Sequence, residues 1–509
     1  TQAATAKTAP LEPLLDTLLG KPVDEATDAF RSPLYNYFFS QTRLEQNPQA
    51  YLDYLTAISA IRAHVREYGA SQHPTLATFM TFIGLHKSLG TPLSLNRHIL
   101  EGDDDAVHLM TAHASKGLEF ETVFLINATD ATWGEKARGR SRLIAYPDNM
   151  PLAPAGNTPD ERLRLFYVAM TRAKNQLTIS YASETLSGKH LLRASFLSTA
   201  EASVVEPTTS IEHRTAQAEA AWFVPLVQPS TDLKTLLKPR LERYKLSATH
   251  LNRFVDVMNG GPQSFLLDNL LHFPSAKSDS ARYGSAIHRT LQNAHTHRVA
   301  TGEQKPAEDI LHDFEEQLKR ERIPPTAYEQ WLQKGSEHLQ AFLTQKPNAF
   351  TATQRAELNF STQDVHVGDA HITGLLDVAD IHTQQKTMVV TDYKTGKPIK
   401  DGKTRTEYEK VKLYKYQQQL LFYKLLVERS RDFQAYTVTD GIVSFVEPTQ
   451  SGEIVDSRAT YSPEAIERTE KLIQAVWNHI TSLTLPDISD YEPTLKGIIQ
   501  FEDDLIATL

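Results

Sequence analysis

The sequence is 509 residues long, with 23% charged and 40% hydrophobic residues, and at about 150 residues per domain it predicts roughly three globular domains. No stretch approaches the roughly 18 consecutive apolar residues of a transmembrane helix, and the absence of cysteine excludes disulfides, thiolate catalysis, cysteine-ligated zinc and iron–sulfur clusters. The net charge of −9 means that any nucleic-acid partner must meet a local basic patch.

The N-terminal third begins without a signal-peptide pattern, which favours an intracellular, cytoplasmic protein or a piece of one. Residues 11–89 carry apolar side chains at helical spacing and predict a helical region. An acidic cluster within residues 101–105 interrupts the pattern. Val107, Leu109 and residues 123–126 then indicate short buried strands of an α/β layer. A domain boundary near residue 105 follows.

The next predicted elements are a helix, a strand and a linker. Residues 158–175 are expected to form the helix, with Thr158 as N-cap and Pro159 at the first helical position. Residues 177–181 are expected to form the strand after it. Residues 200–245 are rich in Thr, Ser, Pro, Glu and Ala with little periodicity, and therefore favour a solvated linker.

A further domain is predicted from about residue 246 to the end of the sequence. Helical patterns run through residues 247–345, two strand-like runs follow at 371–381 and 387–393, and residues 407–428 indicate another helix. This alternation predicts an α/β domain.

Two motifs in the first half resemble motifs V and VI of the UvrD-like superfamily 1 DNA helicases. They are LMTAHASKGLEF at residues 109–120 and DERLRLFYVAMTRAK at residues 160–174. An arginine at the seam between two domains can stabilise charge on a transferred phosphoryl group. The resemblance implies that Arg172 is the arginine finger on the γ-phosphate of ATP, that Lys116, Gly117 and Glu119 lie beside the nucleotide, and that Thr111 and His113 face single-stranded DNA.

The phosphate-binding loop of such a motor, Gly-x-x-x-x-Gly-Lys-[Ser/Thr], is not found in this sequence. The nearest segments, 187–190 and 395–398, continue from Gly-Lys to His and Pro, and lack the first glycine. The resemblance therefore implies a partial second RecA-like domain, and a chain that is the C-terminal part of a longer polypeptide.

Two carboxylates and a lysine dominate the strand-like runs of the second half. Asp392 and Lys394 are two residues apart and share one face of a strand. A hairpin centred on Gln384 and Gln385 would place Asp377 directly opposite Asp392. Opposed like charges are destabilising unless positive charge lies between them, and a divalent metal ion would supply it. Oxygen ligands in an open site favour Mg²⁺ or Mn²⁺ over zinc.

This half resembles the PD-(D/E)XK nuclease domain of the RecB/AddA type. The resemblance rests on the segments LSATHLNRF at 246–254, YGSAIH at 283–288, Glu357, GLLD at 374–377, TDYK at 391–394 and YQQQLLFY at 416–423. It implies that His288, Asp377, Asp392 and the main-chain carbonyl of Tyr393 are metal ligands, that Lys394 is the catalytic lysine, and that Gln419 and Tyr423 complete the active site. Gln419 and Tyr423 are four residues apart and share one helix face, which suits a wall beside the DNA.

Two features extend the comparison. Some relatives hold an iron–sulfur cluster through a Cys-Pro-x-x-Phe segment, whereas residues 261–265 here are Gly-Pro-Gln-Ser-Phe, so no such cluster can form. Basic side chains cluster after the TDYK segment and predict a ridge that tracks DNA phosphates. They are Lys394, Lys397, Lys400, Lys403, Arg405, Lys410, Lys412 and Lys415.

The sequence thus predicts an α/β protein with four parts: a helical insertion remnant (1–105), a partial second RecA-like helicase domain (106–199), a linker (200–245) and a restriction-endonuclease-like PD-(D/E)XK domain (246–509). The expected function is the C-terminal part of an ATP-dependent helicase–nuclease that cleaves DNA in double-strand-break repair. The expected cofactors are Mg²⁺ or Mn²⁺, with ATP for the complete helicase. The expected partners are single- and double-stranded DNA ends and a missing helicase half or partner subunit, at the bacterial nucleoid and without a membrane. The alternative is a catalytically idle DNA-binding or structural subunit.

Overall fold

The structure of the chain is a computed structural model. It describes residues 10–19, 32–68, 74–90, 93, 107–134, 159–185, 188–197, 232–399 and 406–509. The chain divides into two compact units, one made of Thr1–Gly102 with Gln228–Leu509 and the other of Asp103–Val227. The N-terminal helices therefore belong to the same unit as the C-terminal region.

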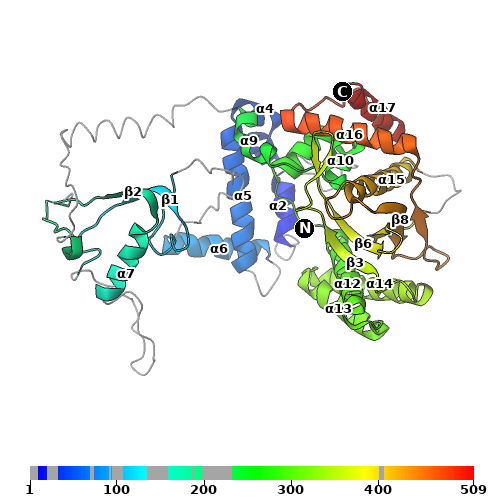
Figure 1. Cartoon of the computed structure of the whole chain (residues 1–509), viewed down its shortest axis with the longest axis horizontal. Coiled ribbons are helices and arrows are strands. Elements are labelled where there is room, and N and C mark those ends of the chain that lie inside the picture. Colours follow the sequence, from blue (N-terminus) through cyan, green and yellow to red (C-terminus); the bar gives the residue numbers. More distant parts are fainter. Residues whose placement is uncertain are drawn as a thin grey trace. The chain divides into compact units, whose positions relative to one another are not determined.

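The smaller unit contains a parallel pair of strands beside one helix (Figure 1). Strand β1 (Phe120–Leu125) pairs with β2 (Ala173–Ile179), and α7 (Pro159–Met170) comes directly before β2. A small core forms where Phe166 of α7 packs with Leu125 of β1. A short 3₁₀ helix, η2 (Ser195–Leu197), follows.

Three sequence predictions for this unit were wrong in detail. Val107 and Leu109 are not in strands, and their side chains are 98% and 91% exposed. The helix expected over 158–175 ends at Met170, because the chain must turn at Arg172 before β2 can pair with β1. The strand expected at 177–181 therefore begins earlier, at Ala173. The expected N-cap at residue 158 lies outside the described residues.

The larger unit is built around a mixed sheet with the strand order β3-β6-β7-β8-β9. All neighbouring pairs are antiparallel except β7 and β8, which are parallel and are joined through helix α15. A separate two-stranded hairpin, β4-β5, comes just before β6. The strands are β3 (Gln354–Asn359), β4 (Val365–Val367), β5 (Ala370–Ile372), β6 (Leu375–His382), β7 (Thr387–Lys394), β8 (Thr437–Phe445) and β9 (Asp456–Arg458).

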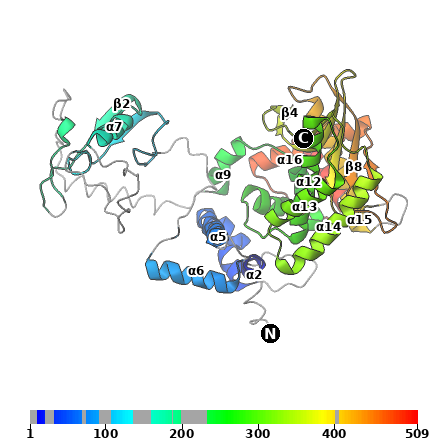
Figure 2. The same cartoon turned by 90° about the horizontal axis from the view of Figure 1, so that it is seen from below.

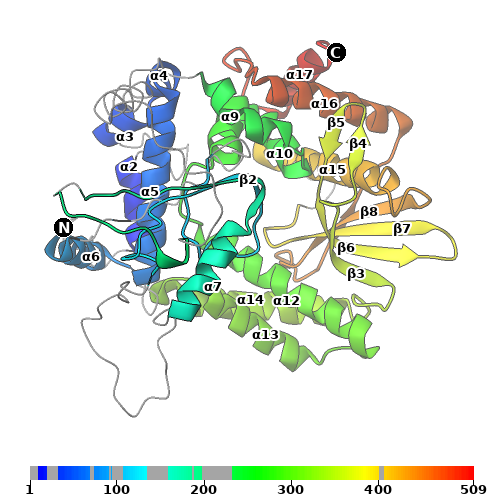
Figure 3. The ribbon, with the colours of Figure 1, turned by 60° about the vertical axis from the view of Figure 1, so that its left-hand side comes forward.

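Helices cover both faces of this sheet, as Figure 3 shows, with α12, α13 and α14 on one side and α15 on the other. Side chains of β7 alternate between the two layers, because Val390 joins the core around α15 while Tyr393 joins the core of α12 to α14. The helices of this region are α10 (Ala248–Phe254), α11 (Gly261–Phe265), α12 (Asp279–Thr301), α13 (Ala307–Arg320), α14 (Pro325–Gln345), α15 (Glu407–Glu428), α16 (Pro463–Ser482) and α17 (Leu495–Ile506), with a 3₁₀ turn at Val257–Asn259 and a π-helical turn at Leu266–Leu270.

Part of the N-terminal helical region shares the main hydrophobic core of this unit, whereas Leu11, Val65 and Phe82 form a separate small core. Phe39 is 1% exposed, and its ring lies edge-on to Phe273, with centroids 5.2 Å apart. Tyr51 and Leu55 of α5 belong to the same core. The helices are α2 (Leu11–Leu19), α3 (Pro33–Phe38), α4 (Gln41–Gln46), α5 (Pro48–Tyr68) and α6 (Leu76–Leu89).

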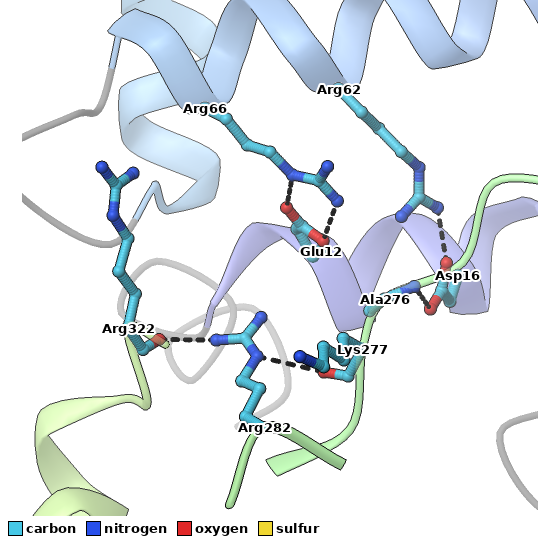
Figure 4. Close-up of polar contacts among 8 residues, drawn as sticks. All are labelled: Glu12, Asp16, Arg62, Arg66, Ala276, Lys277, Arg282 and Arg322. Carbon is cyan, nitrogen blue, oxygen red and sulfur yellow. Dashed lines mark hydrogen bonds and ion pairs between the residues drawn. The ribbon is translucent and has the colours of Figure 1, made fainter. Parts of the chain in front are cut away.

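A polar network also fastens α2 and α5, which lie side by side in Figures 1 and 2, to the segment before α12 (Figure 4). The buried carboxylate of Asp16 pairs with Arg62 at 2.5 Å and accepts a hydrogen bond from the amide of Ala276 at 2.8 Å. One turn away along α2, Glu12 pairs with Arg66. A cavity of about 930 Å³ borders this network, and Glu12, Asp16 and Arg66 help to line it.

The predicted linker requires a correction at its C-terminal end. Residues 233–242 form helix α9 (Leu233–Glu242), which buries Leu237 and Leu241 in the main core. Residues 200–231 of the expected linker lie outside the described residues. Among the helices that the structure describes, none is long and apolar enough to cross a membrane.

Candidate active site

The hairpin β6-β7 has the register predicted from its sequence. Val378 pairs with Thr391, and the pairing continues to His382 with Thr387. The next step of this register places Asp377 opposite Asp392, at the end of the ladder. The two carboxylates therefore come from neighbouring strand ends, at the edge where α12 and α15 approach the sheet.

Asp392 is held on the α15 side of the sheet by two side chains. One carboxylate oxygen lies 2.6 Å from Nζ of Lys394, and the other accepts a hydrogen bond of 2.9 Å from Nε2 of Gln419. Oε1 of Gln419 also accepts from Lys394 at 3.2 Å, and its Nε2 lies 2.6 Å from the Tyr423 hydroxyl. The ring of Tyr416 lies beneath the Lys394 ammonium at 5.2 Å. Two turns of α15, from Tyr416 to Tyr423, thus fix both Asp392 and Lys394.

Asp377 is held by a different set of groups, which includes His288 of α12. Its Oδ2 lies 3.3 Å from Nδ1 of His288 and accepts a hydrogen bond of 2.8 Å from the amide of Tyr393. Gly284, one turn before His288 in α12, lets the helix approach β7, since a Cβ there would lie 3.1 Å from Oγ1 of Thr395. The structure therefore brings together His288, Asp377 and the backbone of Tyr393.

Burial and neighbouring charges shift the pKa values of the two aspartates in opposite directions. Burial raises the pKa of Asp392, and repulsion from Asp377 adds to this, although Lys394 opposes it. Burial also acts to raise the pKa of Asp377, but His288, the Tyr393 amide and Lys394 outweigh it, so the net shift is downward. The pKa of His288 is raised because the nearby carboxylates outweigh the effect of burial. Asp377 therefore loses its proton more readily than Asp392 does.

Two further residues belong to this neighbourhood. Burial and the charge of Asp377 raise the pKa of Glu357, while His288 opposes the shift, so this carboxyl on β3 is part of the same electrostatic cluster. Its φ of +53° is unusual for a residue other than glycine. Glu357 was one of the residues on which the resemblance to the nuclease family rests, but its position in the sequence did not predict that it lies near the hairpin.

His295 of α12 supports the site from the opposite face of the sheet. Its Nε2 lies 3.0 Å from the Tyr393 hydroxyl and anchors that ring. In the sequence, the only sign of this role is that His295 comes seven residues after His288 and so lies on the same face of α12.

The chemical types of donor at this edge suit a hard divalent cation, although His288, Asp377 and Asp392 do not meet the spacing of a formed metal site in the structure. The edge offers carboxylate oxygens from Asp377 and Asp392 and one imidazole at His288, and such oxygen-rich sets suit Mg²⁺ or Mn²⁺. The buried Asp392 carboxylate, whose pKa burial raises, is the kind of group that a bound cation would stabilise in its ionised form. In the structure, Lys394 supplies the positive charge that faces it.

In the smaller unit, Arg172 is anchored to its own surroundings. Its Nε donates to the carbonyl of Val168 at 2.9 Å and its guanidinium also donates to the carbonyl of Leu118 at 3.0 Å. These bonds join the end of α7 to the loop that carries Lys116 and Gly117. Gly117 has a φ of +86°, which favours glycine at the turn into β1. The remaining predicted nucleotide residue, Glu119, lies 4.0 Å from Lys174.

The residues predicted to face DNA in this unit are exposed. Thr111 begins a turn, and its hydroxyl and carbonyl accept hydrogen bonds from the amides of Ala114 and Ser115. His113 lies exposed on the same turn. Both residues precede Lys116 in one continuous loop, so the two expected binding functions lie close together in the chain.

The predicted basic ridge is partly neutralised. Lys410 pairs with Glu407, and Lys415 pairs with the buried carboxylate of Asp256 at 2.5 Å. The ridge residues within 400–405 lie outside the described residues. Lys394 remains the basic group in direct contact with the carboxylate cluster.

Comparison with known families finds two matches in separate parts of the chain, and the first of them includes residues of both compact units. Residues 34–184 match the UvrD-like helicase C-terminal domain, so the match includes helices α3 to α6 as well as Arg172. Residues 245–490 match the PD-(D/E)XK nuclease superfamily, and this range contains the whole carboxylate cluster.

Individual relatives match shorter stretches. The A-type subunit of the ATP-dependent helicase/nuclease of Lacticaseibacillus paracasei is 33% identical over 157 residues, which is 27% of this chain and 12% of the relative. The same-named protein of Leuconostoc mesenteroides is 31% identical over 160 residues, 26% of this chain and 13% of the relative. DNA helicase II of Escherichia coli is 39% identical over 88 residues, 17% of this chain and 10% of the relative. The matched part of the chain thus spans about an eighth or less of each of these relatives.

Proposed function

Since the chain joins a UvrD-like helicase C-terminal region to a PD-(D/E)XK nuclease domain, we propose that it is the C-terminal part of a helicase–nuclease that hydrolyses DNA phosphodiester bonds during double-strand-break repair. The observation that supports this most directly is the convergence of Asp377, Asp392 and Lys394 at the end of one hairpin, with Gln419 bridging the last two.

In this proposal His288, Asp377, Asp392 and the carbonyl of Tyr393 hold Mg²⁺ or Mn²⁺. When bound, the cation would act as a Lewis acid on the scissile phosphate and lower the pKa of a coordinated water. Lys394 keeps a positive charge beside the carboxylates, where it would stabilise the added negative charge on the phosphate oxygens as water attacks and one P–O ester bond breaks.

The wall formed by α15 has a positioning role. Gln419 hydrogen bonds with Asp392, Lys394 and Tyr423, so it fixes the lysine in line with the carboxylate before any substrate arrives. Such pre-organisation lowers the cost of aligning the reacting groups.

The helicase half of the proposal concerns ATP. Arg172 would act as an arginine finger, with Lys116, Gly117 and Glu119 beside the nucleotide and with Thr111 and His113 on single-stranded DNA. This requires a phosphate-binding loop from a longer form of the polypeptide or from a partner subunit, because none is found in these 509 residues. The guanidinium would also have to exchange at least one of its present hydrogen bonds for a phosphate oxygen.

A cleavage assay on the full chain tests the nuclease proposal. Lys394→Met removes the charge at the site, and Lys386→Met removes a lysine from the turn at the opposite end of the same hairpin. With end-labelled linear DNA and Mg²⁺, we expect Lys394→Met to lower the cleavage rate by about a hundredfold or more, while Lys386→Met cleaves at the parental rate.

Two outcomes would contradict the proposal. No cleavage by the parent under any divalent cation would favour the idle, DNA-binding alternative. Parental cleavage that persists in excess EDTA would exclude the metal-dependent mechanism.

A further inference from the structure

A second cluster of metal-binding side chains lies outside the carboxylate site, on the hairpin β4-β5. Asp364, His366 and His371 offer ligand atoms that all lie within 4.8 Å of one another. Nε2 of each histidine lies 3.3 Å from the same carboxylate oxygen of Asp364. Within the described ranges of the chain, this is the one group of three such residues that meets this spacing.

The fold of the hairpin explains why the two imidazoles converge. His366 and His371 are directly opposite each other in the antiparallel ladder, and their rings stack with centroids 4.5 Å apart. Their strand neighbours Val365, Val367, Ala370 and Ile372 are fully buried against the main core. Side chains alternate along a strand, so the histidine pair must face away from that core together.

The backbone around the cluster is fixed on both sides. The tight turn at Gly368 rests on α16, since a Cβ there would lie 2.2 Å from Oε1 of Gln474. On the other edge, the amide of Leu246 donates to the carbonyl of His371 at 2.9 Å, and the amide of Thr373 donates back to Leu246 at 2.8 Å. The fold therefore fixes the hairpin that carries the two histidines, whereas the side chain of Asp364 is 78% exposed.

The spacing, at which His366 hydrogen bonds with Asp364 and both histidines form ion pairs with it, also suits a metal site. Tetrahedral ligands bound at about 2.0 Å lie roughly 3.3 Å from one another, which matches both Nε2 to Oδ1 separations. A single carboxylate can balance only one imidazolium, and two stacked imidazolium rings would repel each other. Nε2 of His371 is also buried, and its 3.3 Å contact with Oδ1 of Asp364 does not have hydrogen-bond geometry, so it makes no hydrogen bond among the described residues. A cation shared by both imidazoles would satisfy it.

We propose that Asp364, His366 and His371 bind one transition-metal ion of the Zn²⁺ class, with water completing its coordination. Two imidazoles and one carboxylate favour Zn²⁺, Co²⁺ or Ni²⁺ over Mg²⁺, so the site differs in kind from the oxygen-rich cluster at Asp377. Two cationic side chains act on this group electrostatically but make their direct contacts elsewhere: Lys245 donates to the carbonyl of Ser361 at 2.7 Å, and Arg431 pairs with Asp432 at 2.9 Å.

The position of the site gives it a structural role. The hairpin leads through Gly374 directly into β6, the strand that carries Asp377. An ion that links β4 to β5 would stabilise the entry to that strand. This role is independent of whether the domain cleaves DNA.

The test measures Zn²⁺ binding to the full chain after EDTA treatment, with Mg²⁺ in large excess so that oxygen-rich sites are filled. Zinc retained after gel filtration is counted by elemental analysis, and Co²⁺ absorption spectra report the ligand set. We expect the parent to hold one Zn²⁺, and His366→Gln or the pair His366→Gln/His371→Gln to bind it at least about tenfold more weakly. The Zn²⁺-induced rise in thermal midpoint should be lost in parallel.

Two control variants define the assignment. His382→Gln removes another partly exposed histidine near a carboxylate, Asp380 at 3.9 Å, and should leave Zn²⁺ binding unchanged. Asp392→Asn alters the carboxylate site and should also retain the ion. His366 is nearly half exposed, so its replacement should not prevent folding. The proposal fails if the hairpin variants bind Zn²⁺ as the parent does, or if Asp392→Asn is the variant that loses it.

Discussion

Asp392 combines burial, an ion pair and a place at the reacting edge of the sheet. Its side chain is only 4% exposed, and Lys394 lies 2.6 Å away. The hairpin pattern alone predicted two opposed carboxylates that need positive charge between them. It could not show that Lys394 already neutralises Asp392, because that contact depends on the lysine rotamer that Gln419 selects from α15.

Replacing Asp392 by Asn should separate folding from cleavage. The raised pKa of Asp392 means that its ionised form costs folding stability at neutral pH, so the EDTA-treated variant should melt at or above the parental temperature. Cleavage should fall by about a hundredfold or more. At a Mg²⁺ concentration a hundred times its Kd, the parent should gain about 2.7 kcal/mol and the variant clearly less. Equal Mg²⁺ stabilisation of both proteins would argue against Asp392 as a ligand.

The buried imidazole of His295 makes the fold sensitive to acid. Burial lowers its pKa to about 4, while the unfolded chain protonates this residue near its ordinary value. Stability is therefore lost as pH falls from about 6.5 to about 4, and between pH 7 and 5 His295 alone should account for about 2 kcal/mol.

Urea unfolding of the metal-free protein at both pH values measures this loss. His295→Gln should be less stable at pH 7 but should lose less on acidification. His250, whose pKa burial also lowers to about 4, contributes to both proteins, so the difference between parent and variant isolates His295. Identical losses would contradict the assignment.

At the scale of elements, local patterns predicted well and long-range pairing did not. The helix expected over 407–428 is α15 (Glu407–Glu428), with a capping box at Thr406 and Glu409, and the hairpin β6-β7 has the expected register. By contrast, β8 was not predicted although it is the parallel partner of β7. Its pairing depends on a crossover through α15, which short-range alternation does not reveal.

The crossing of α12, α13 and α14 depends on one glycine. A Cβ at Gly335 of α14 would lie 2.1 Å from Cζ of Phe314 and 3.0 Å from Tyr283. Gly335→Ala should therefore force these helices apart and lower the free energy of unfolding by about 1–3 kcal/mol. Gly84→Ala, in α6, meets no atom within 4 Å and should be neutral or stabilising by up to about 1 kcal/mol. Thermal denaturation of both variants provides the comparison, and an unchanged midpoint for Gly335→Ala would contradict it.

At the scale of the whole molecule, the sequence predicted the two functional regions but not how the N-terminal helices are attached. Helical spacing indicated a separate helical region, whereas Phe39 packs on Phe273 and α9 joins the same core. Aromatic periodicity shows that a face is buried without showing which distant segment covers it. The larger unit therefore folds around residues from both ends of the described chain.

Asp16 should be the polar residue on which this attachment depends most. Asp16→Ala would leave the buried Arg62 without its counter-ion and the Ala276 amide without its acceptor (Figure 4), a loss of about 3–5 kcal/mol. Glu12→Gln alters the neighbouring, more exposed pair with Arg66 and should cost less than about 1 kcal/mol. Differential scanning calorimetry should show the large shift only for Asp16→Ala, and similar shifts for both variants would contradict this role.

The alternation of β7 has a consequence for how inherited variation in this segment is interpreted. Asp392 and Lys394 contact Gln419 on one side of the sheet, while the intervening Tyr393 side chain is buried on the other side beside His295 and Phe342. In a saturation screen scored separately for cellular abundance and for DNA cleavage, adjacent codons should fall into different classes. Changes at 392 and 394 should leave well-folded but inactive protein, whereas changes at 393 should first reduce the amount of protein. The effect of a missense substitution in this strand therefore has to be interpreted from the face of the sheet to which the substituted side chain points, before a loss of cleavage is attributed to the chemistry of the site.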